Sequence, residues 1–319
     1  MMFKTQNYEV TKGINYEYVY VQANNDLKPT FLFLHGFPST FYSWRHQIKY
    51  FSEQGYGCLA PNLMGYGKTY SPLNKDEYKL KSMVTHLIAL LNHLHLNKVI
   101  VVGHDWGTAP AIRFVLYNPE RTLSLVLISV GYRPPAKMDL DQVLETSKKI
   151  LGYENFGYWK FFESDDAATI IENNVDSFID LLFSNNSGEK KINFAPVGKI
   201  QEWLMNGQRT IRASYMTEDD YGNFRENLLE GMQPKLNWYK AAIENINWDD
   251  EKNLDPIIKC PVLFFTGTKD SVCVTALFAG QKQYIADLEV VELEAGHWLM
   301  EEKPNEINQG IEHWIKRIG

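Results

Sequence analysis

A chain of 319 residues with 45% hydrophobic and 22% charged residues can bury a large core, which predicts one globular domain carrying an insertion. The formal net charge of −7 and the lack of a lysine- or arginine-rich run argue against nucleic acid and anionic membranes as partners and favour a small neutral substrate. Three cysteines without a Cys-x-x-Cys pair suggest no disulfide framework, and no apolar run approaches the roughly 18 residues of a membrane span. With no apolar signal region either, we expect a cytoplasmic protein.

Two strands are predicted near the start of the chain. Residues 13–23, GINYEYVYVQA, alternate in the manner of a strand, and Thr30–Leu34 form a short apolar run. The second strand leads directly into the sequence HGFPST, where glycine and proline impose an irregular turn at the carboxyl end of the strand. Backbone N–H groups can point into a site at such a turn.

Helices and strands then alternate. Residues 43–55 have a helical pattern, residues 57–61 form a short strand, and residues 79–96 carry leucines, methionine and valine at helical spacing. A further apolar strand follows at residues 123–129. This alternation of helices and strands predicts an α/β fold with a mostly parallel sheet flanked by helices.

Three histidines on the 79–96 helix are not expected to bind a metal. His93 and His95 are two residues apart and cannot share one helix face, so solvated or core histidines explain them better. We predict no metal site.

The stretch at residues 98–107, KVIVVGHDWG, predicts a buried strand, a sharp turn and the start of a helix. Asp105 stands where Gly-x-Ser-x-Gly hydrolases carry their nucleophilic serine, between Gly103 and Gly107. A carboxylate is already ionised at neutral pH and suits displacement at saturated carbon, which leaves an ester that water must hydrolyse. The alternative is an aspartate that only caps the helix.

The sheet pattern stops near residue 130. We predict a first part of the core at residues 1–130, an inserted helical cap at 131–253 and a second part of the core at 254–319. Asp270 and His297 each follow a predicted strand, and open α/β sheets gather their ligand sites at those strand ends. Together with Asp105 they should therefore converge, in the chain order of nucleophile, acid and histidine that this fold uses.

Four motifs give the sequence a family resemblance over essentially its whole length. The chain resembles the epoxide hydrolases of the α/β-hydrolase fold, in particular the hydrolase domain of soluble epoxide hydrolase. The motifs are HGFP at 35–38, GHDWG at 103–107, TGTKD at 266–270 and GHW at 296–298.

The resemblance implies a hydrolase that converts an epoxide and water to a vicinal diol without a cofactor. Asp105 would attack a ring carbon while two cap tyrosines, Tyr158 and Tyr239, donate to the epoxide oxygen. His297, oriented by Asp270, would then activate the water that hydrolyses the ester.

Further residues of the site follow from the same resemblance. The backbone N–H groups of Phe37 and Trp106 would form the oxyanion hole, and their side chains would contact substrate together with Tyr153 and Trp298. Tyr153 also lies close enough in sequence to Tyr158 to be the first ring-opening tyrosine instead.

Two other functions are compatible with the same sequence features. Haloalkane dehalogenases share the fold, the aspartate and the Asp-Trp-Gly sequence, but they commonly use an asparagine where this chain has Phe37, and halide release from chloroalkanes would distinguish them. A binding protein that keeps the fold without turnover is the second alternative, which the intact set of Asp105, Asp270 and His297 disfavours. The expected partner is a small epoxide, and the chain could be a monomer or a homodimer.

Overall fold

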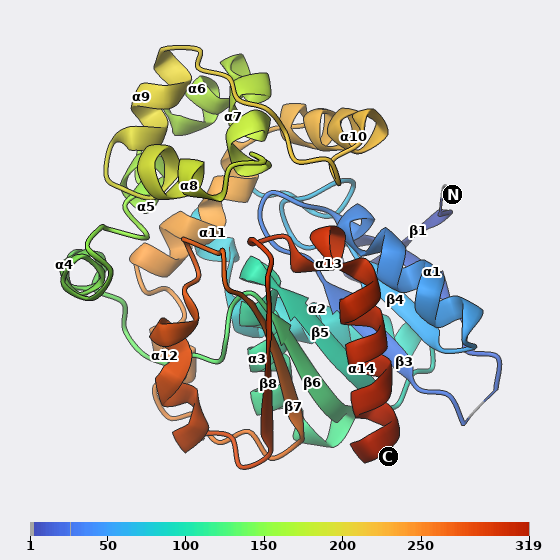
Figure 1. Cartoon of the computed structure of the whole chain (residues 1–319). Helices are drawn as coiled ribbons and strands as arrows, with labels where there is room; N and C mark the ends of the chain where they lie inside the picture. The colour runs from blue at the N-terminus through green and yellow to red at the C-terminus, as the bar shows by residue number, and fades with distance from the viewer. Residues whose placement is uncertain (1–2, 26, 319) are drawn as a thin grey trace.

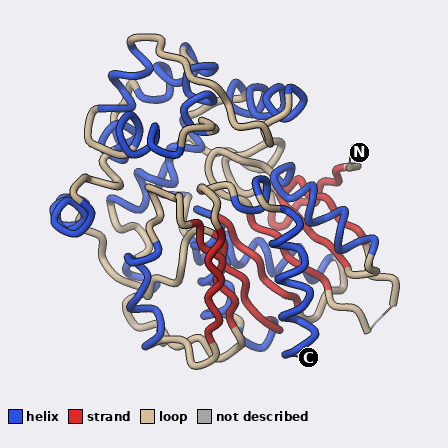
Figure 2. The backbone as a smooth tube through the Cα atoms, in the orientation of Figure 1, coloured by secondary structure: helices blue, strands red, loops and turns tan. Residues whose placement is uncertain are grey.

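A single mixed sheet of eight strands forms the centre of the molecule (Figures 1 and 2). The structure is a computed structural model and describes residues 3–25 and 27–318. The strands are arranged in the order β1-β2-β4-β3-β5-β6-β7-β8, antiparallel from β1 to β4 and parallel from there on. They are β1 (Thr5–Thr11), β2 (Ile14–Val21), β3 (Thr30–Leu34), β4 (Gly57–Pro61), β5 (Val99–His104), β6 (Thr122–Ile128), β7 (Val262–Gly267) and β8 (Leu288–Leu293).

Helices of the core cover both faces of this sheet. In Figure 1, α1 and α14 lie in front of the strands, and α2 and α3 lie behind them. Every residue of β3, β4 and β5 is buried, as expected for parallel strands that are covered on both sides. The core helices are α1 (Arg45–Glu53), α2 (Leu80–His93), α3 (Thr108–Tyr117), α13 (Leu299–Glu302) and α14 (Pro304–Ile318).

The remaining helices form an insertion between β6 and β7, seen at the top and left of Figure 1. They are α4 (Leu140–Leu151), α5 (Tyr158–Glu163), α6 (Ala167–Asn173), α7 (Val175–Leu182), α8 (Ser187–Glu189), α9 (Lys199–Met205), α10 (Glu218–Leu229), α11 (Gln233–Ile243) and α12 (Trp248–Glu251). The predicted α/β-hydrolase fold with a helical cap is therefore confirmed. The boundaries at residues 131 and 253 stay a prediction.

The first strand, β1, was not predicted from the sequence. The residues of β1 are exposed or only partly buried, and the strand pairs only with β2 at the edge of the sheet. Its sequence, TQNYEVT, is mostly polar on both faces, so the apolar signal of a strand is weak.

Within the described ranges, no helix combines the length and the apolar character needed to cross a membrane.

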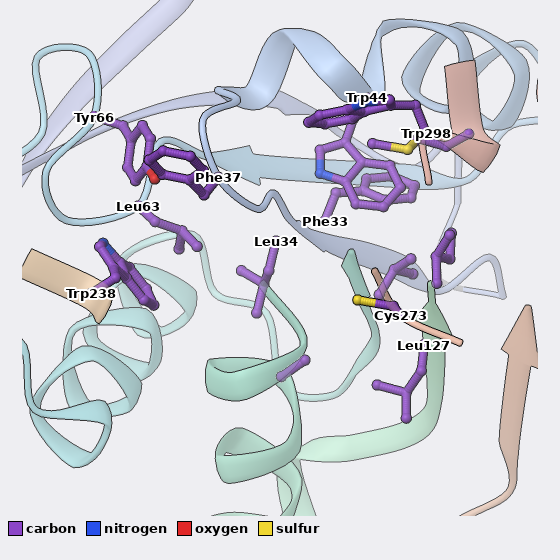
Figure 3. Close-up of a cluster of buried hydrophobic side chains, with 14 of the residues drawn as sticks. Phe33, Leu34, Phe37, Trp44, Leu63, Tyr66, Leu127, Trp238, Cys273 and Trp298 are labelled. Carbon is purple, nitrogen blue, oxygen red and sulfur yellow. The ribbon is translucent and has the colours of Figure 1, made fainter. Parts of the chain in front are cut away.

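One continuous hydrophobic cluster runs from the core into the cap. Figure 3 draws part of it and shows that residues predicted for the site, Phe37 and Trp298, lie among core side chains such as Leu34 and Leu127. The carboxyl ends of the parallel strands therefore meet the cap through packed side chains, and the site lies at this junction.

A charged cluster also joins cap and core. Nη2 of Arg45, in α1, lies 3.0 Å from Oδ1 of Asp220 in cap helix α10 and 3.5 Å from Oε2 of Glu301 in α13. The Tyr42 hydroxyl donates to the same oxygen of Asp220 at 3.0 Å. Burial raises the pKa of Glu301 to about 7, although Arg45 partly opposes the shift. The free energy of unfolding should therefore depend on the ionisation of Glu301.

We expect Glu301→Gln to stabilise the protein more at pH 8 than at pH 4.5. A carboxyl whose pKa rises from 4.5 to about 7 on folding stabilises the fold below pH 4.5 and loses that contribution as the pH rises through 7. Glutamine never ionises, so its advantage in unfolding free energy should grow over this interval by roughly 1–3 kcal/mol. Denaturant unfolding across the pH range measures it. A stability advantage of Glu301→Gln that does not change with pH would contradict the assignment.

Candidate active site

Asp105 sits at a tight elbow between β5 and α3. Its backbone φ is +50°, in the left-handed region that non-glycine residues rarely adopt. A Cβ atom on Gly103 would lie only 2.7 Å from the carbonyl oxygen of Gly107, so the close approach of strand and helix requires a residue without a side chain. The elbow holds the carboxylate above the carboxyl end of the central strand. Backbone strain of this kind is typical of functional sites.

The Asp105 side chain does not cap the helix. The N-cap position of α3 is Gly107, and no side chain caps it. Instead, Oδ1 of Asp105 accepts a hydrogen bond of 2.8 Å from the backbone N–H of Phe37, in the loop after β3. Burial alone would raise the pKa of Asp105, but His297 and the backbone N–H of Trp106 outweigh it and lower the pKa. The carboxylate is therefore ionised at neutral pH.

His297 and Asp270 complete a row of three side chains with Asp105. Nε2 of His297 lies 3.3 Å from Oδ2 of Asp105, and Nδ1 lies 2.7 Å from Oδ2 of Asp270. The other oxygen of Asp270 accepts from the backbone N–H groups of Val272 and Cys273 at 2.8 and 3.0 Å. The loop after β7 thus fixes the carboxylate that orients the histidine.

The negative charges of Asp105 and Asp270 determine whether His297 is protonated. Burial alone would raise the pKa of Asp270, but its interaction with His297 lowers it to about 2. Burial alone would lower the pKa of His297, but Asp270 and Asp105 together raise it well above its usual value. His297 therefore keeps a proton while both carboxylates are charged, and it becomes a stronger acid when either charge is removed.

Two tyrosines of the cap pack over the elbow. Tyr158 begins α5 and Tyr239 lies in α11, and their ring centroids are 5.9 Å apart. The Tyr239 ring stands edge to face against both Phe37 and Trp106, with centroids 5.0 Å apart in each pair. Burial raises the pKa of both tyrosines well above 10, with a further contribution from the charge of Asp105. Both hydroxyl groups are therefore protonated and can donate hydrogen bonds.

Tyr153 and Trp298, two other residues predicted to contact substrate, donate hydrogen bonds to carbonyl groups of the protein. The Tyr153 hydroxyl donates a hydrogen bond of 2.6 Å to the carbonyl of Ser271, beside Asp270. Trp298 is 1% exposed, and its indole N–H donates to the carbonyl of Leu182 at 3.2 Å. Contact of Tyr153 and Trp298 with substrate stays a prediction.

Cys273 belongs to the site but was not singled out from the sequence. Ligand-type atoms of Cys273, Asp270 and His297 all lie within 4.8 Å of one another. Both ring nitrogens of His297 already face carboxylates, an arrangement that suits proton transfer better than metal binding. No sequence motif marks Cys273, because only the folded loop after β7 brings it to the histidine.

The chain is similar to known proteins in sequence. Residues 29–304 match the alpha/beta hydrolase fold family. Epoxide hydrolase 3 of Siraitia grosvenorii is 32% identical over 314 residues, which cover 91% of this chain and 92% of the relative. Bifunctional epoxide hydrolase 2 of Mus musculus is 27% identical over 90% of this chain, but the chain spans only 52% of that relative's length.

Solved structures show the same similarity. The epoxide hydrolase of Vigna radiata has a TM-score of 0.80 and 26% identity, and the match covers 98% of each chain. Epoxide hydrolase A of Mycobacterium thermoresistibile has a TM-score of 0.84 at 23% identity, covering 99% of this chain and 98% of its own. At that identity the second comparison supports the fold alone.

Proposed function

The chain belongs to the epoxide hydrolases of the α/β-hydrolase fold, and from this premise we propose that it converts an epoxide and water to a vicinal diol through a covalent ester on Asp105. The observation that carries the proposal is the placement of two protonated tyrosines over an ionised aspartate, which is itself linked to a histidine and a second carboxylate. The partner is a small-molecule epoxide.

The first step opens the ring. Asp105 attacks one ring carbon with a carboxylate that the Phe37 N–H orients. Tyr158 and Tyr239 both donate hydrogen bonds to the epoxide oxygen, and one of them gives its proton to the alkoxide and is left as a tyrosinate. Burial helps them, because it keeps both tyrosines protonated until the alkoxide forms. No base is needed at this stage.

The second step hydrolyses the ester. Alkylation removes the negative charge of Asp105, which lowers the pKa of His297, since this carboxylate is one of the two that raise it. His297 then gives up its proton, which restores the tyrosinate left by the first step, and it can accept a proton from water while Asp270 holds its other nitrogen. The N–H groups of Phe37 and Trp106 stabilise the oxyanion that forms when water adds to the ester carbonyl.

The same geometry disfavours the dehalogenase alternative. The Phe37 side chain is a hydrocarbon ring and cannot donate a hydrogen bond to a halide. The paired tyrosine hydroxyls, in contrast, suit a leaving group that stays attached as an alkoxide and needs a proton. Diol formation from a panel of small terminal, aryl and long-chain internal epoxides tests the proposal. Halide release from chloroalkanes without any diol product would overturn it.

We expect Tyr239→Phe and Tyr158→Phe each to slow ring opening by roughly 10²–10⁴-fold, because each removes a positioned acid. Tyr153→Phe should cost much less, since the Tyr153 hydroxyl is engaged with the Ser271 carbonyl. Single-turnover rates of ester formation, measured for all three variants, give the comparison. A greater loss in Tyr153→Phe than in Tyr158→Phe would assign the first acid to Tyr153.

A further inference from the structure

Trp159, in cap helix α5, has an indole N–H that is buried and donates to no acceptor among the described residues. A buried donor without an acceptor has given up its hydrogen bond to water and gained nothing in return, which destabilises the fold. Such groups are rare in proteins, and each one calls for a physical reason.

Other buried tryptophans differ from Trp159 in this respect. Three of them donate to backbone carbonyls, namely Trp203 to Ser177 at 3.2 Å, Trp238 to Met64 at 2.9 Å and Trp298 to Leu182 at 3.2 Å. In the part of the chain that the structure describes, Trp44 is the other tryptophan whose buried N–H lacks a partner, and its ring packs against Phe33 of the central sheet. Trp159 is therefore distinguished by the side chains around it.

The Trp159 ring lies among the groups proposed to open the epoxide. Its centroid is 5.1 Å from that of Tyr239, at an interplanar angle of 88°, and 6.5 Å from that of Tyr158. It is also 5.3 Å from the ring of Trp106, which follows Asp105 in the chain. The unpaired donor thus belongs to a side chain that contacts both tyrosines.

An acceptor for this N–H forms during the reaction, when one tyrosine loses its proton. Burial raises the pKa of Tyr158, and the Trp159 N–H and the Tyr239 hydroxyl act against this rise, because both can donate to an ionised phenol oxygen. Burial and the charge of Tyr158 raise the pKa of Tyr239, while the Trp106 N–H opposes the rise. Negative charge is therefore better accommodated on Tyr158, while Tyr239 keeps its proton.

We propose that Tyr158 is the tyrosine that protonates the alkoxide, and that the indole N–H of Trp159 donates a hydrogen bond to the tyrosinate left behind. The O–H bond of Tyr158 breaks, its proton bonds to the alkoxide oxygen, and the electron pair stays on the phenol oxygen. The donor gains a charged acceptor only as the ring opens, so it lowers the barrier without tightening substrate binding. Trp159 acts through Tyr158 and is a positioning residue. This inference deepens the proposed function and rests on it for the reaction.

The first test is Trp159→Phe, which keeps an aromatic ring and removes the N–H. Hydrogen bonds to charged groups shift an equilibrium by about 10–100-fold, and the transition state realises part of this effect. We therefore expect ring opening to slow by roughly 3–30-fold, with substrate affinity unchanged. Single-turnover rates of ester formation at several epoxide concentrations measure both quantities. An unchanged rate, or a loss confined to affinity, would overturn the proposal.

A double-mutant cycle separates this role from packing. In a Tyr158→Phe background there is no oxygen to ionise, so Trp159→Phe should cause no further loss. A loss caused by looser packing of the Tyr239 ring, or by a missing bond to substrate, would persist in that background and would contradict the proposal. The matched control is Trp203→Phe, a buried cap tryptophan whose N–H is engaged with Ser177. It should leave the rate of ring opening unchanged.

A titration tests the donor without any turnover. A ring-nitrated tyrosine placed at position 158 gives a phenolate that absorbs visible light, apart from the other tyrosines. Trp159→Phe should raise the pKa of this phenol by about 1–2, as expected when a hydrogen bond to a charged group is lost, and Trp203→Phe should leave it unchanged. A raised pKa would support the donor even if no epoxide were hydrolysed, and an unchanged pKa in Trp159→Phe would refute it.

Discussion

Diol formation by Asp105→Ala should fall by roughly 10⁴-fold or more while the protein stays folded, because the variant lacks the atom that bonds to carbon. Alanine cannot form the ester, and the site offers no second carboxylate in place of the nucleophile, since Asp270 is held by His297 and by two backbone N–H groups. Steady-state turnover of an epoxide, with circular dichroism and thermal unfolding as controls, measures the effect. Asp165→Ala, in a fully exposed part of the cap, is the matched control.

An isotope experiment tests the same assignment without a mutation. In a single turnover in heavy-oxygen water with enzyme in excess, the oxygen transferred to carbon comes from the carboxylate, so the diol should be unlabelled. The label should instead appear in the peptide that contains Asp105. Near-normal activity of Asp105→Ala, or labelled diol from the first turnover, would show that water attacks the epoxide directly.

The row of Asp105, His297 and Asp270 could be predicted from the sequence because a local sequence pattern marks each of these residues. Asp105 and Asp270 follow short apolar runs and His297 follows the alternating sequence LEVVEL, patterns that predict strands, and parallel strands end at the same edge of a sheet. The structure brings their atoms within 3.3 Å of one another along the row. Gly103 and Gly107 marked the elbow for a similarly local reason, since a strand and a helix that approach so closely exclude a Cβ atom.

Groups supplied by the cap and by the loops could not be predicted in the same way. Tyr153 and Tyr158 both lie in one aromatic segment, and only the start of α5 at Tyr158 and the packing of its ring against Tyr239 distinguish them. Cys273 belongs to no motif. It lies close to His297, which is distant in sequence, and helical periodicity carries no information about such a pair.

His297→Gln should separate the two chemical steps and trap the intermediate. Ring opening needs an ionised Asp105 and protonated tyrosines but no base, so it should proceed in this variant. Ester hydrolysis needs a proton acceptor for water, which glutamine does not supply, and should slow by several orders of magnitude. Mixing the variant with an epoxide and recording the intact mass should therefore show an adduct equal to enzyme plus substrate.

The pH dependence of the two steps also tests whether the charge of Asp105 controls the pKa of His297. In the proposed mechanism, alkylation of Asp105 would remove one of the two carboxylates that raise the pKa of His297, so the histidine would become a base only after the ester has formed. Ester hydrolysis in the wild type should then rise with pH through the lowered pKa of His297, while ring opening should stay flat over the same range. Pre-steady-state rates of the two steps between pH 5 and 9 measure both profiles. If His297→Gln accumulates no adduct, or if ring opening follows the same pH profile as hydrolysis, His297 acts in the first step and the covalent sequence proposed for this site is wrong.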